Sequence, residues 1–408
     1  MTGGEQVGSI VFDEPEAGGS AAGAEELTAG PGGPRLSRRH LLLGAAGLAG
    51  AGAAAWWAAG PGDAPDPDAG RPQPVAVSGP QPSWSFRAPA AQAPERVVGP
   101  TVLPLVATED ELFLLTPETG AVAKRVAMPG GPDDTLLAAG DLLYQTRVGR
   151  FLAHGYGMTL QVANPSGLSP SWELLAVGGD VLYGATRGLK DGKLFALSMA
   201  SGALLWTRPV VDRDGGYLKA LETVRGRAVL VAHSTRDEVV GLDPETGERI
   251  WAAPADQGLS WRECGADDVY VASRATGIRS LSLRDGSANW TVEEQEARPL
   301  RPLAFGNTLF LLRDNGVVSC NDARDGGELW SRQLPFRLDA RCRPVLVAGS
   351  LFVPGPVSGG VCALDERTGA VRWTFRDAEP GVQYWRVATD GRHLFLGHDR
   401  VLHGLAPA

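Results

Sequence analysis

The chain has 408 residues, of which 43% are hydrophobic and 21% are charged, and its formal net charge is -9. This length is enough for one large hydrophobic core or two ordinary ones. Proteins that bind nucleic acids usually present a basic surface, so the acidic balance argues against a nucleic-acid partner.

The first 82 residues differ in composition from the rest of the chain. Residues 1–36 contain few large apolar side chains and are expected to be disordered, because they cannot bury enough surface to offset their ordering entropy. Residues 63–82 are rich in Pro, Asp and Gly, which is typical of a semi-extended linker. Residues 83–406 remain as the folded domain.

Between these two segments lies an export or anchor segment, residues 37–62. It begins with Ser37-Arg38-Arg39-His40-Leu41 and continues into an uncharged run rich in Ala and Gly, a pattern that resembles a twin-arginine export signal. Alternatively, residues 41–60 stay uncleaved and cross a membrane, with the arginines placing the N-terminus inside. Both alternatives predict an extracytoplasmic location for the folded domain.

One sequence unit recurs through the folded domain. In its clearest copy an apolar strand, 239–242, leads into Asp243-Pro244-Glu245-Thr246-Gly247, a tight-turn sequence whose glycine suits a positive φ. Trp251 follows the glycine by four residues, on the predicted return strand. The same glycine-to-tryptophan spacing occurs in five pairs: Gly202 and Trp206, Gly247 and Trp251, Gly286 and Trp290, Gly326 and Trp330, Gly369 and Trp373.

The spacing of these copies predicts the fold class. Consecutive glycines lie 39 to 45 residues apart, which fits four short antiparallel strands and their turns, the size of one propeller blade. The sequence shows short runs rich in Val, Leu and Phe, such as 308–311 and 351–353. It does not show the apolar repeat of 3.6 residues that is typical of amphipathic helices. We therefore expect an all-β domain built as a β-propeller.

The two ends of the domain predict how the propeller closes. The last copy stops after residue 405 without a tryptophan strand, whereas Trp84-Ser85-Phe86-Arg87 closely resembles Trp373-Thr374-Phe375-Arg376. An N-terminal strand that completes the last blade would remove the exposed sheet edges. Eight blades are expected, or seven if the poorly matching copy at 135–170 is not a blade.

The pattern of apolar strand, Asp, Thr or Asp, Gly and Trp resembles the PQQ-like, or quinoprotein-type, β-propeller repeat over residues 84–405. The resemblance implies that Trp84, Trp206, Trp251, Trp290, Trp330 and Trp373 pack between neighbouring blades. The family contains quinoprotein dehydrogenases and also non-enzymatic propellers that scaffold outer-membrane assembly or form extracellular sensor domains. The dehydrogenases have adjacent cysteines against their cofactor, and this chain has none, so no cofactor and no enzymatic activity are expected.

Candidate ligand-binding residues recur where the innermost strands should begin, close to the central channel. Cationic and aromatic side chains in such a ring suit an anionic ligand or an acidic partner loop. The alternative is that they make packing contacts and ion pairs between blades. These residues are Lys219, Trp261, Arg262, Arg301, Arg343, Trp385 and Arg386.

Cysteines and histidines predict no metal site. None of Cys264, Cys320, Cys342 and Cys362 lies within four residues of another, so they are expected to be buried thiols, although an even count also permits disulfides. His393, His398 and His403 are five apart, and on one strand they would alternate between faces and not cluster.

The predicted function is therefore an envelope-associated, extracytoplasmic propeller that binds a protein partner or an anionic ligand without catalysis. A quinone-dependent oxidoreductase is the alternative.

Overall fold

The computed structural model describes residues 79–88, 96–98, 104–107, 111–127, 136–139, 142–147, 150–154, 159–163, 172–178, 180–186, 192–199, 201–209, 218–223, 230–234, 238–254, 259–265, 267–273, 277–293, 297–381 and 384–406. All of them fall within one of the two compact units of the chain, the unit that includes Ala76–Ala408. The predicted disordered segment, export or anchor segment and most of the linker lie outside the described residues.

Every regular element among the described residues is a β-strand. In the first half of the domain they are β1 (Trp84–Arg87), β2 (Arg96–Val98), β3 (Leu105–Ala107), β4 (Glu111–Leu115), β5 (Val122–Ala127), β6 (Leu136–Ala139), β7 (Leu142–Arg147), β8 (Arg150–His154), β9 (Thr159–Ala163), β10 (Trp172–Gly178), β11 (Val181–Thr186), β12 (Lys193–Ser198), β13 (Leu204–Pro209), β14 (Leu218–Thr223), β15 (Leu230–Ser234), β16 (Glu238–Leu242) and β17 (Arg249–Pro254). In the second half they are β18 (Leu259–Cys264), β19 (Asp268–Ser273), β20 (Gly277–Ser282), β21 (Ala288–Val292), β22 (Leu303–Phe305), β23 (Thr308–Leu312), β24 (Val317–Asp322), β25 (Glu328–Gln333), β26 (Val345–Val347), β27 (Ser350–Pro354), β28 (Val361–Asp365), β29 (Val371–Phe375), β30 (Arg386–Thr389), β31 (Leu394–His398) and β32 (Val401–Leu405).

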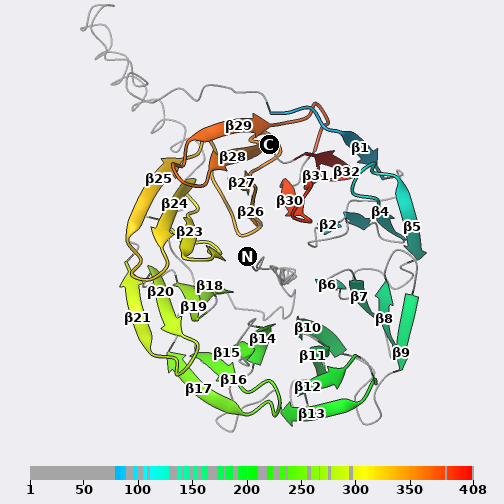
Figure 1. Cartoon of the computed structure of the whole chain (residues 1–408), viewed down its shortest axis with the longest axis vertical. Coiled ribbons are helices and arrows are strands. Elements are labelled where there is room, and N and C mark those ends of the chain that lie inside the picture. Colours follow the sequence, from blue (N-terminus) through cyan, green and yellow to red (C-terminus); the bar gives the residue numbers. More distant parts are fainter. Residues whose placement is uncertain are drawn as a thin grey trace, which may run out of the picture. The chain divides into compact units, whose positions relative to one another are not determined.

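These strands form antiparallel sheets of four, which confirms the predicted all-β class. Seven of the eight sheets in the described part of the chain consist of four consecutive strands, beginning at β2, β6, β10, β14, β18, β22 and β26. Strands β6 to β9 form one of them, in the region whose repeat was hard to recognise in the sequence. In Figure 1 the opening strands β2, β6, β10, β14, β18 and β26 lie nearest the middle of the view, and the closing strands of these sheets lie at the periphery.

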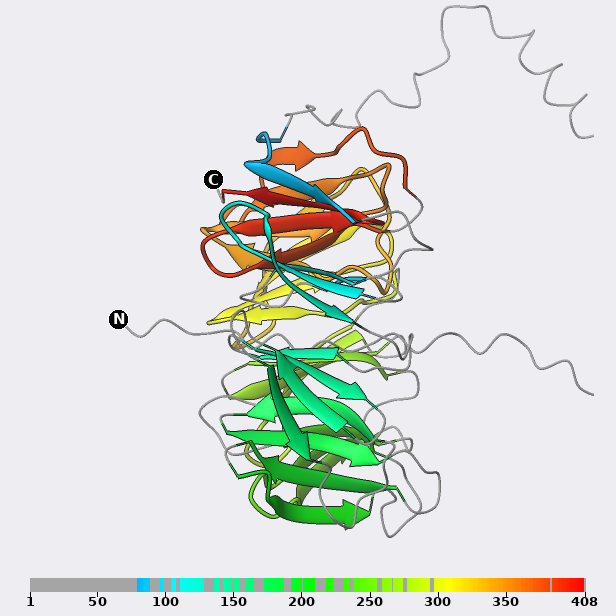
Figure 2. The ribbon, with the colours of Figure 1, turned by 90° about the vertical axis from the view of Figure 1, so that its right-hand side faces the viewer.

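The eighth sheet joins the two ends of the domain. Its order is β1-β32-β31-β30, and β1 pairs antiparallel with β32, with Trp84 opposite Gly404 and Arg87 opposite Val401. The blue β1 and the dark red β32 lie side by side in both views (Figures 1 and 2). The N-terminal strand therefore completes the last four-stranded sheet, as predicted from its resemblance to residues 373–376.

The apolar runs form the buried middle strands. β23, β27 and β31 are buried along most of their length, whereas the peripheral β25 shows the alternating exposure of an edge strand with one covered face. Neighbouring sheets pack face to face: Phe310 and Val318 share one hydrophobic cluster with Leu351 and Val353 of the following sheet.

The repeated turn has the predicted geometry. Asp243 Oδ1 accepts the backbone N–H groups of Glu245 at 2.8 Å and Thr246 at 2.9 Å. Gly247 follows with a φ of 70°, a value that an L-residue with a side chain adopts only with strain. The pairing of β16 with β17 then shifts register between Gly241 and Leu242, which is the expected bulge.

The tryptophans of the repeat connect successive sheets. In five of the pairs among the described residues, the indole N–H donates to a backbone carbonyl in the next sheet and the indole face lies on that sheet's turn glycine. The donated bonds are Trp84 to Pro117 O (2.8 Å), Trp206 to Pro244 O (2.8 Å), Trp251 to Leu283 O (2.9 Å), Trp290 to Ala323 O (3.0 Å) and Trp330 to Glu366 O (2.8 Å). Trp373 shares a hydrophobic cluster with Val387, Leu394 and Leu405 of the last sheet.

A small residue stands opposite each of these tryptophans on the neighbouring strand of its own sheet. The cross-strand partners are Ala196, Gly241, Ser280, Cys320, Ala363 and Gly404. At Gly241 and Gly404 an added Cβ would lie only 2.2 and 2.1 Å from the ring of Trp251 and Trp84. The thiol of Cys320 thus occupies a position that the repeat reserves for a small side chain.

Candidate functional site

Two buried histidines and a largely buried carboxylate gather where β1 meets β32. In the clear repeats a glycine-containing turn joins the third strand of a sheet to the fourth. In the last sheet these two strands come from opposite ends of the domain, so no such turn joins them. Residues 79–82 occupy this place instead, and the N–H of Gly79 donates to the carbonyl of Thr374 in β29 at 2.9 Å.

A pocket of about 790 Å³ opens beside this junction. Its volume falls in the usual range of small-molecule sites. Apolar walls come from prolines and aromatic rings, and polar groups come from both ends of the domain. The lining residues are Gly79, Pro80, Gln81, Pro82, Trp84, Ser85, Thr374, Phe375, Arg376, Asp377 and His403.

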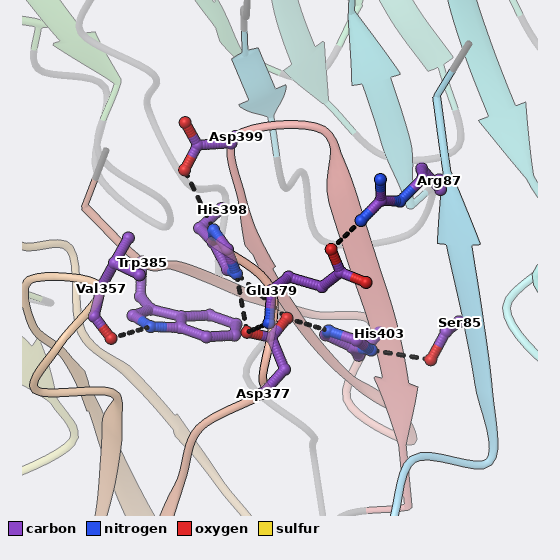
Figure 3. A network of polar contacts seen from close by, with 9 residues as sticks. All are labelled: Ser85, Arg87, Val357, Asp377, Glu379, Trp385, His398, Asp399 and His403. Carbon is purple, nitrogen blue, oxygen red and sulfur yellow. Dashed lines mark hydrogen bonds and ion pairs between the residues drawn. The ribbon is translucent and has the colours of Figure 1, made fainter. Parts of the chain in front are cut away.

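Three of the lining residues form a chain of hydrogen bonds (Figure 3). The Oγ of Ser85 lies 2.7 Å from Nδ1 of His403. Nε2 of the same imidazole lies 2.8 Å from Oδ2 of Asp377. Cross-strand pairing places Ser85 opposite His403, and the segment between β29 and β30 supplies Asp377.

These contacts determine which nitrogen of His403 carries the proton. An ionised carboxylate can only accept, so the nitrogen facing Asp377, Nε2, is the donor. Nδ1 then keeps its lone pair and accepts the Ser85 hydroxyl proton. Burial lowers the pKa of His403, with the Asp377 carboxylate opposing that shift, so a neutral imidazole is favoured.

A second histidine holds Asp377 in place. Nε2 of His398 lies 3.0 Å from both carboxylate oxygens of Asp377, and its Nδ1 lies 3.0 Å from Oδ2 of Asp399. The side chain of His398 has no exposed surface. Both ring nitrogens of His398 therefore face carboxylate oxygens.

Trp385 forms the apolar side of this network. Its ring meets the edge of His398 at a centroid distance of 4.3 Å, and its indole N–H donates to the carbonyl of Val357 at 3.3 Å. Phe375 packs edge-on against both Trp385 and His403. These ring contacts restrict the orientation of both imidazoles, and Figure 3 shows Trp385 beside His398.

The sequence-based expectation that these histidines would not cluster is wrong for His398 and His403. They lie on the two strands of one hairpin, and His398 pairs with Val401 while His403 pairs with Leu396. The two histidines are therefore diagonal neighbours on the same face of the sheet. His393 lies elsewhere and contacts Asp390 Oδ2 at 2.8 Å.

The predicted ligand-binding residues lie within or just before the strands β14, β18, β22, β26 and β30. Lys219 is in β14 and Trp261 and Arg262 are in β18, in stretches where the structure describes the backbone alone. Arg301 precedes β22 and is only 8% exposed. Arg301 is therefore too buried to present its side chain freely to a ligand in solvent.

The remaining members of the predicted set lie at β26 and β30. Arg343 precedes β26, is half-buried, and donates to the carbonyl of Ala340 at 2.6 Å. Arg386 begins β30 and is also half-buried. Trp385 has no exposed surface, so its indole offers no face to a ligand arriving from solvent and instead packs on His398.

The cysteines whose side chains the structure describes, Cys320, Cys342 and Cys362, are free and buried. Burial raises the pKa of the Cys320 thiol to about 11, and it raises that of Cys362 to about 11 as well. Burial also raises the pKa of Cys342. Such thiols are packing residues with little thiolate at neutral pH.

Sequence reasoning missed Ser85 and Asp377 as site residues. One signal could have found Ser85: once residues 84–87 are recognised as the closing strand, antiparallel pairing with 401–404 sets Ser85 opposite His403. Asp377 lies in a connection between sheets, outside the repeat, so nothing in the pattern indicates where its side chain points.

The described ranges lack two further features. No group of three or more His, Cys, Asp or Glu side chains there is arranged to hold a metal ion. No helix of the length and hydropathy needed to cross a bilayer occurs in that part of the chain.

Relatives with curated names fall into two groups. The outer membrane protein assembly factor BamB of Pseudomonas aeruginosa is 25% identical over 201 residues, which are 46% of this chain and 51% of that protein. A quinoprotein ethanol dehydrogenase of Pseudomonas putida is 31% identical over 106 residues, which are 23% of this chain and 16% of the enzyme. The chain thus spans about half the length of the assembly factor, and a far smaller part of the dehydrogenase.

Solved structures share the fold. BamB from Moraxella catarrhalis superposes with a TM-score of 0.50 at 17% identity, covering 67% of this chain and 85% of that one. The computationally designed Ika8 protein gives a TM-score of 0.63 at 13% identity, covering 80% of this chain and all of that one. At these identities the likeness is one of fold.

The family model described as outer membrane protein assembly factor BamB matches three overlapping stretches, residues 82–260, 190–304 and 274–405. Together they include nearly the whole described domain and each tryptophan of the repeat. The chain therefore belongs to this family of PQQ-like β-propeller repeat proteins.

Proposed function

We propose that this chain is an extracytoplasmic, envelope-associated β-propeller that binds a protein partner as a scaffold or sensor module. The observation that carries the proposal is the family match across 82–405, together with relatives named as outer-membrane assembly factors. An assembly factor works by contact with other proteins, and a rigid ring of sheets presents fixed surfaces for such contacts.

The architecture we propose is a closed ring of eight blades. The pairing of β1 with β32 supports closure, because it makes one blade from the two ends of the domain. The indole bonds of five repeat tryptophans to the next sheet support tryptophan docking as the link between blades. With Trp84 bonded to Pro117, the same link joins the last blade to the first.

We propose an acidic loop of the partner as the ligand of the inner-strand cations. Of the predicted members whose side chains the structure describes, Arg343 and Arg386 are half-buried and therefore keep surface for a ligand. Both lie at the start of an innermost strand, in consecutive sheets. Partner recognition through such cations depends on ionic strength, because exposed charges are screened by salt.

A two-site variant tests this proposal. Arg343→Ala with Arg386→Ala should reduce by at least about tenfold the recovery of the partner in a crosslinked pull-down from intact envelopes, if each charge contributes about 1 kcal/mol or more. The matched control is Arg324→Ala, because Arg324 lies on a peripheral turn with a side chain 76% exposed. Equal recovery of the partner with the unaltered protein, the double variant and the Arg324→Ala control would exclude the inner-strand site.

The location has its own test. We propose that residues 37–62 export the domain through a twin-arginine signal or hold it in a membrane through 41–60. Replacement of Arg38 and Arg39 by Lys should retain the chain in the cytoplasm if export depends on the arginine pair. Fractionation and protease protection read the outcome, and normal export of the double variant would refute the twin-arginine proposal.

The alternative is a quinone-dependent oxidoreductase, which the match to a quinoprotein ethanol dehydrogenase favours. We propose instead that the chain works without a bound quinone, since that match extends over 16% of the enzyme. Incubation of purified protein with PQQ and Ca²⁺, followed by gel filtration, tests it. A retained chromophore with alcohol-dependent dye reduction would establish the oxidoreductase.

A further inference from the structure

We propose that Ser85 is an activated nucleophile and that the pocket at the β1–β32 junction admits carboxylic esters, whose acyl group Ser85 accepts. A nucleophile bonded to a base, with the base oriented by a third group, is the arrangement that activates serine hydroxyls. Here the three groups are Ser85, His403 and Asp377.

The distances between the hydrogen-bonded atoms of Ser85, His403 and Asp377 suit proton transfer from the serine to the imidazole. The 2.7 Å between Ser85 Oγ and His403 Nδ1 and the 2.8 Å between His403 Nε2 and Asp377 Oδ2 both lie within hydrogen-bond reach. Asp377 faces Nε2 and the serine faces Nδ1. Either imidazole nitrogen can act as the base once the other is held by a carboxylate.

Accessibility favours Ser85 as the reacting group. Ser85 is exposed to solvent. His403 is only 5% exposed, so its imidazole lies behind the serine and is largely shielded from water. Both line the same pocket. A substrate entering the pocket therefore meets the hydroxyl first, with the base behind it.

The pocket walls indicate the class of substrate. Pro80, Pro82, Trp84 and Phe375 supply apolar surface suited to a hydrocarbon or aromatic acyl group. Gln81 and Arg376 line the pocket as well, and they bring N–H donors that suit the carbonyl oxygen of an ester. An ester with an apolar acyl group combines both features.

Two other residues position the hydrogen-bonded groups of Ser85, His403 and Asp377 without touching the reacting atoms. His398 contacts both oxygens of Asp377, which fixes the carboxylate relative to His403. Asp399 contacts the other nitrogen of His398. We assign His398 and Asp399 as positioning residues and Ser85 and His403 as the catalytic pair.

The reaction balances without a further cofactor. Ser85 Oγ forms a bond to the acyl carbon while its proton passes to His403 Nδ1, and the ester C–O bond then breaks. The leaving alcohol takes the proton from His403. Water next attacks the acyl-serine, again giving a proton to Nδ1, and the carboxylic acid leaves as Ser85 recovers its hydrogen.

This activity goes beyond the binding role proposed above and is independent of it. The inner-strand arginines and the junction pocket belong to different parts of the sheets, so either proposal can fail alone.

An alkyl fluorophosphonate tests the nucleophile in the intact chain. Ser85 Oγ should displace fluoride from phosphorus, leaving a phosphonyl adduct that peptide mass spectrometry maps to Ser85. Ser85→Ala should abolish this adduct, and Ser83→Ala is the matched control, because Ser83 is exposed two residues away and outside the pocket lining. No adduct at Ser85, or equal labelling of Ser83 and Ser85, would overturn the proposal.

The role of His403 has a separate readout. His403→Gln should slow labelling by about 10²–10⁴-fold, the range typical of general-base catalysis. In the unaltered chain the labelling rate should rise with pH through one ionisation, below the ordinary value for histidine. Since His403→Gln can also disturb folding, the pH profile of the unaltered protein provides an independent test. A labelling rate that increases only at alkaline pH, in proportion to hydroxide concentration, would contradict activation by His403.

Discussion

The indole of Trp251 lies directly on Gly286 of the following sheet, so that a Cβ built on the glycine would come 2.6 Å from Cε3 of the ring. Two residues of different repeats thus define one contact. The glycine is required both for its φ of 73° and for the space that it leaves to the indole.

The first prediction separates these two requirements. Gly286→Ala should destabilise the domain more than Gly306→Ala, because Gly306 also has a positive φ, 57°, but has no atom within 4 Å of an added Cβ. The control variant should cost about 1–2 kcal/mol from the left-handed conformation. Gly286→Ala should add about 1–3 kcal/mol of overpacking. Urea unfolding followed by circular dichroism measures both, and equal costs would show that the indole contact is unimportant.

The second prediction concerns the tryptophan itself. Trp251→Ala should cost about 3–5 kcal/mol, because the indole is 7% exposed and donates its N–H to Leu283. Ile250→Ala is the neighbouring control: its side chain is 49% exposed, so the change should stay within about 0.5 kcal/mol. Thermal melting compares the two variants. A similar loss at both positions would argue against a special role of the indole in joining sheets.

The third prediction is a pH dependence at the β1–β32 junction. His403 has a lowered pKa in the folded protein, so the folded state binds fewer protons than the unfolded chain in the acidic window. Stability from this group is fully present above the unfolded value of about 6.5 and is lost as the pH falls toward the folded value. The polar and titratable groups that face the His403 imidazole are those of Ser85, Asp377 and His398.

Melting temperatures measured between about pH 5 and pH 8 check this dependence. His403→Gln should flatten the acidic decline, whereas His393→Gln should leave it intact, because His393 lies outside the junction and contacts Asp390. A decline of the same steepness in His403→Gln would assign the pH dependence to other groups.

The fourth prediction concerns the thiols. Cys320, Cys342 and Cys362 should resist iodoacetamide in the folded protein near pH 7.5, because burial raises the pKa of each. All three should react after denaturation in guanidinium. Mass spectrometry of alkylated peptides reads each site separately. Rapid alkylation of Cys320 in the folded state would mean that the space under Trp330 opens readily.

The sequence by itself determined the repeat and hence the class of fold. The spacing of Gly247 and Trp251 and of their counterparts is a local property: the turn needs a positive φ, and the strand needs one large ring at a set distance. Local geometry of this kind is visible along the chain, as is the resemblance of residues 84–87 to residues 373–376. The strand order of the last sheet follows from that resemblance.

Only the tertiary structure decided what the two ends of the domain make together. Ser85, Asp377 and His403 come from three separate segments, and the recurring spacing of Gly and Trp marks none of them as a site residue. Their meeting depends on the register between β1 and β32 and on the course of an irregular connection. The hairpin that brings His398 and His403 to one face likewise reverses an expectation based on spacing alone, because a turn, not distance along one strand, sets which side chains become neighbours.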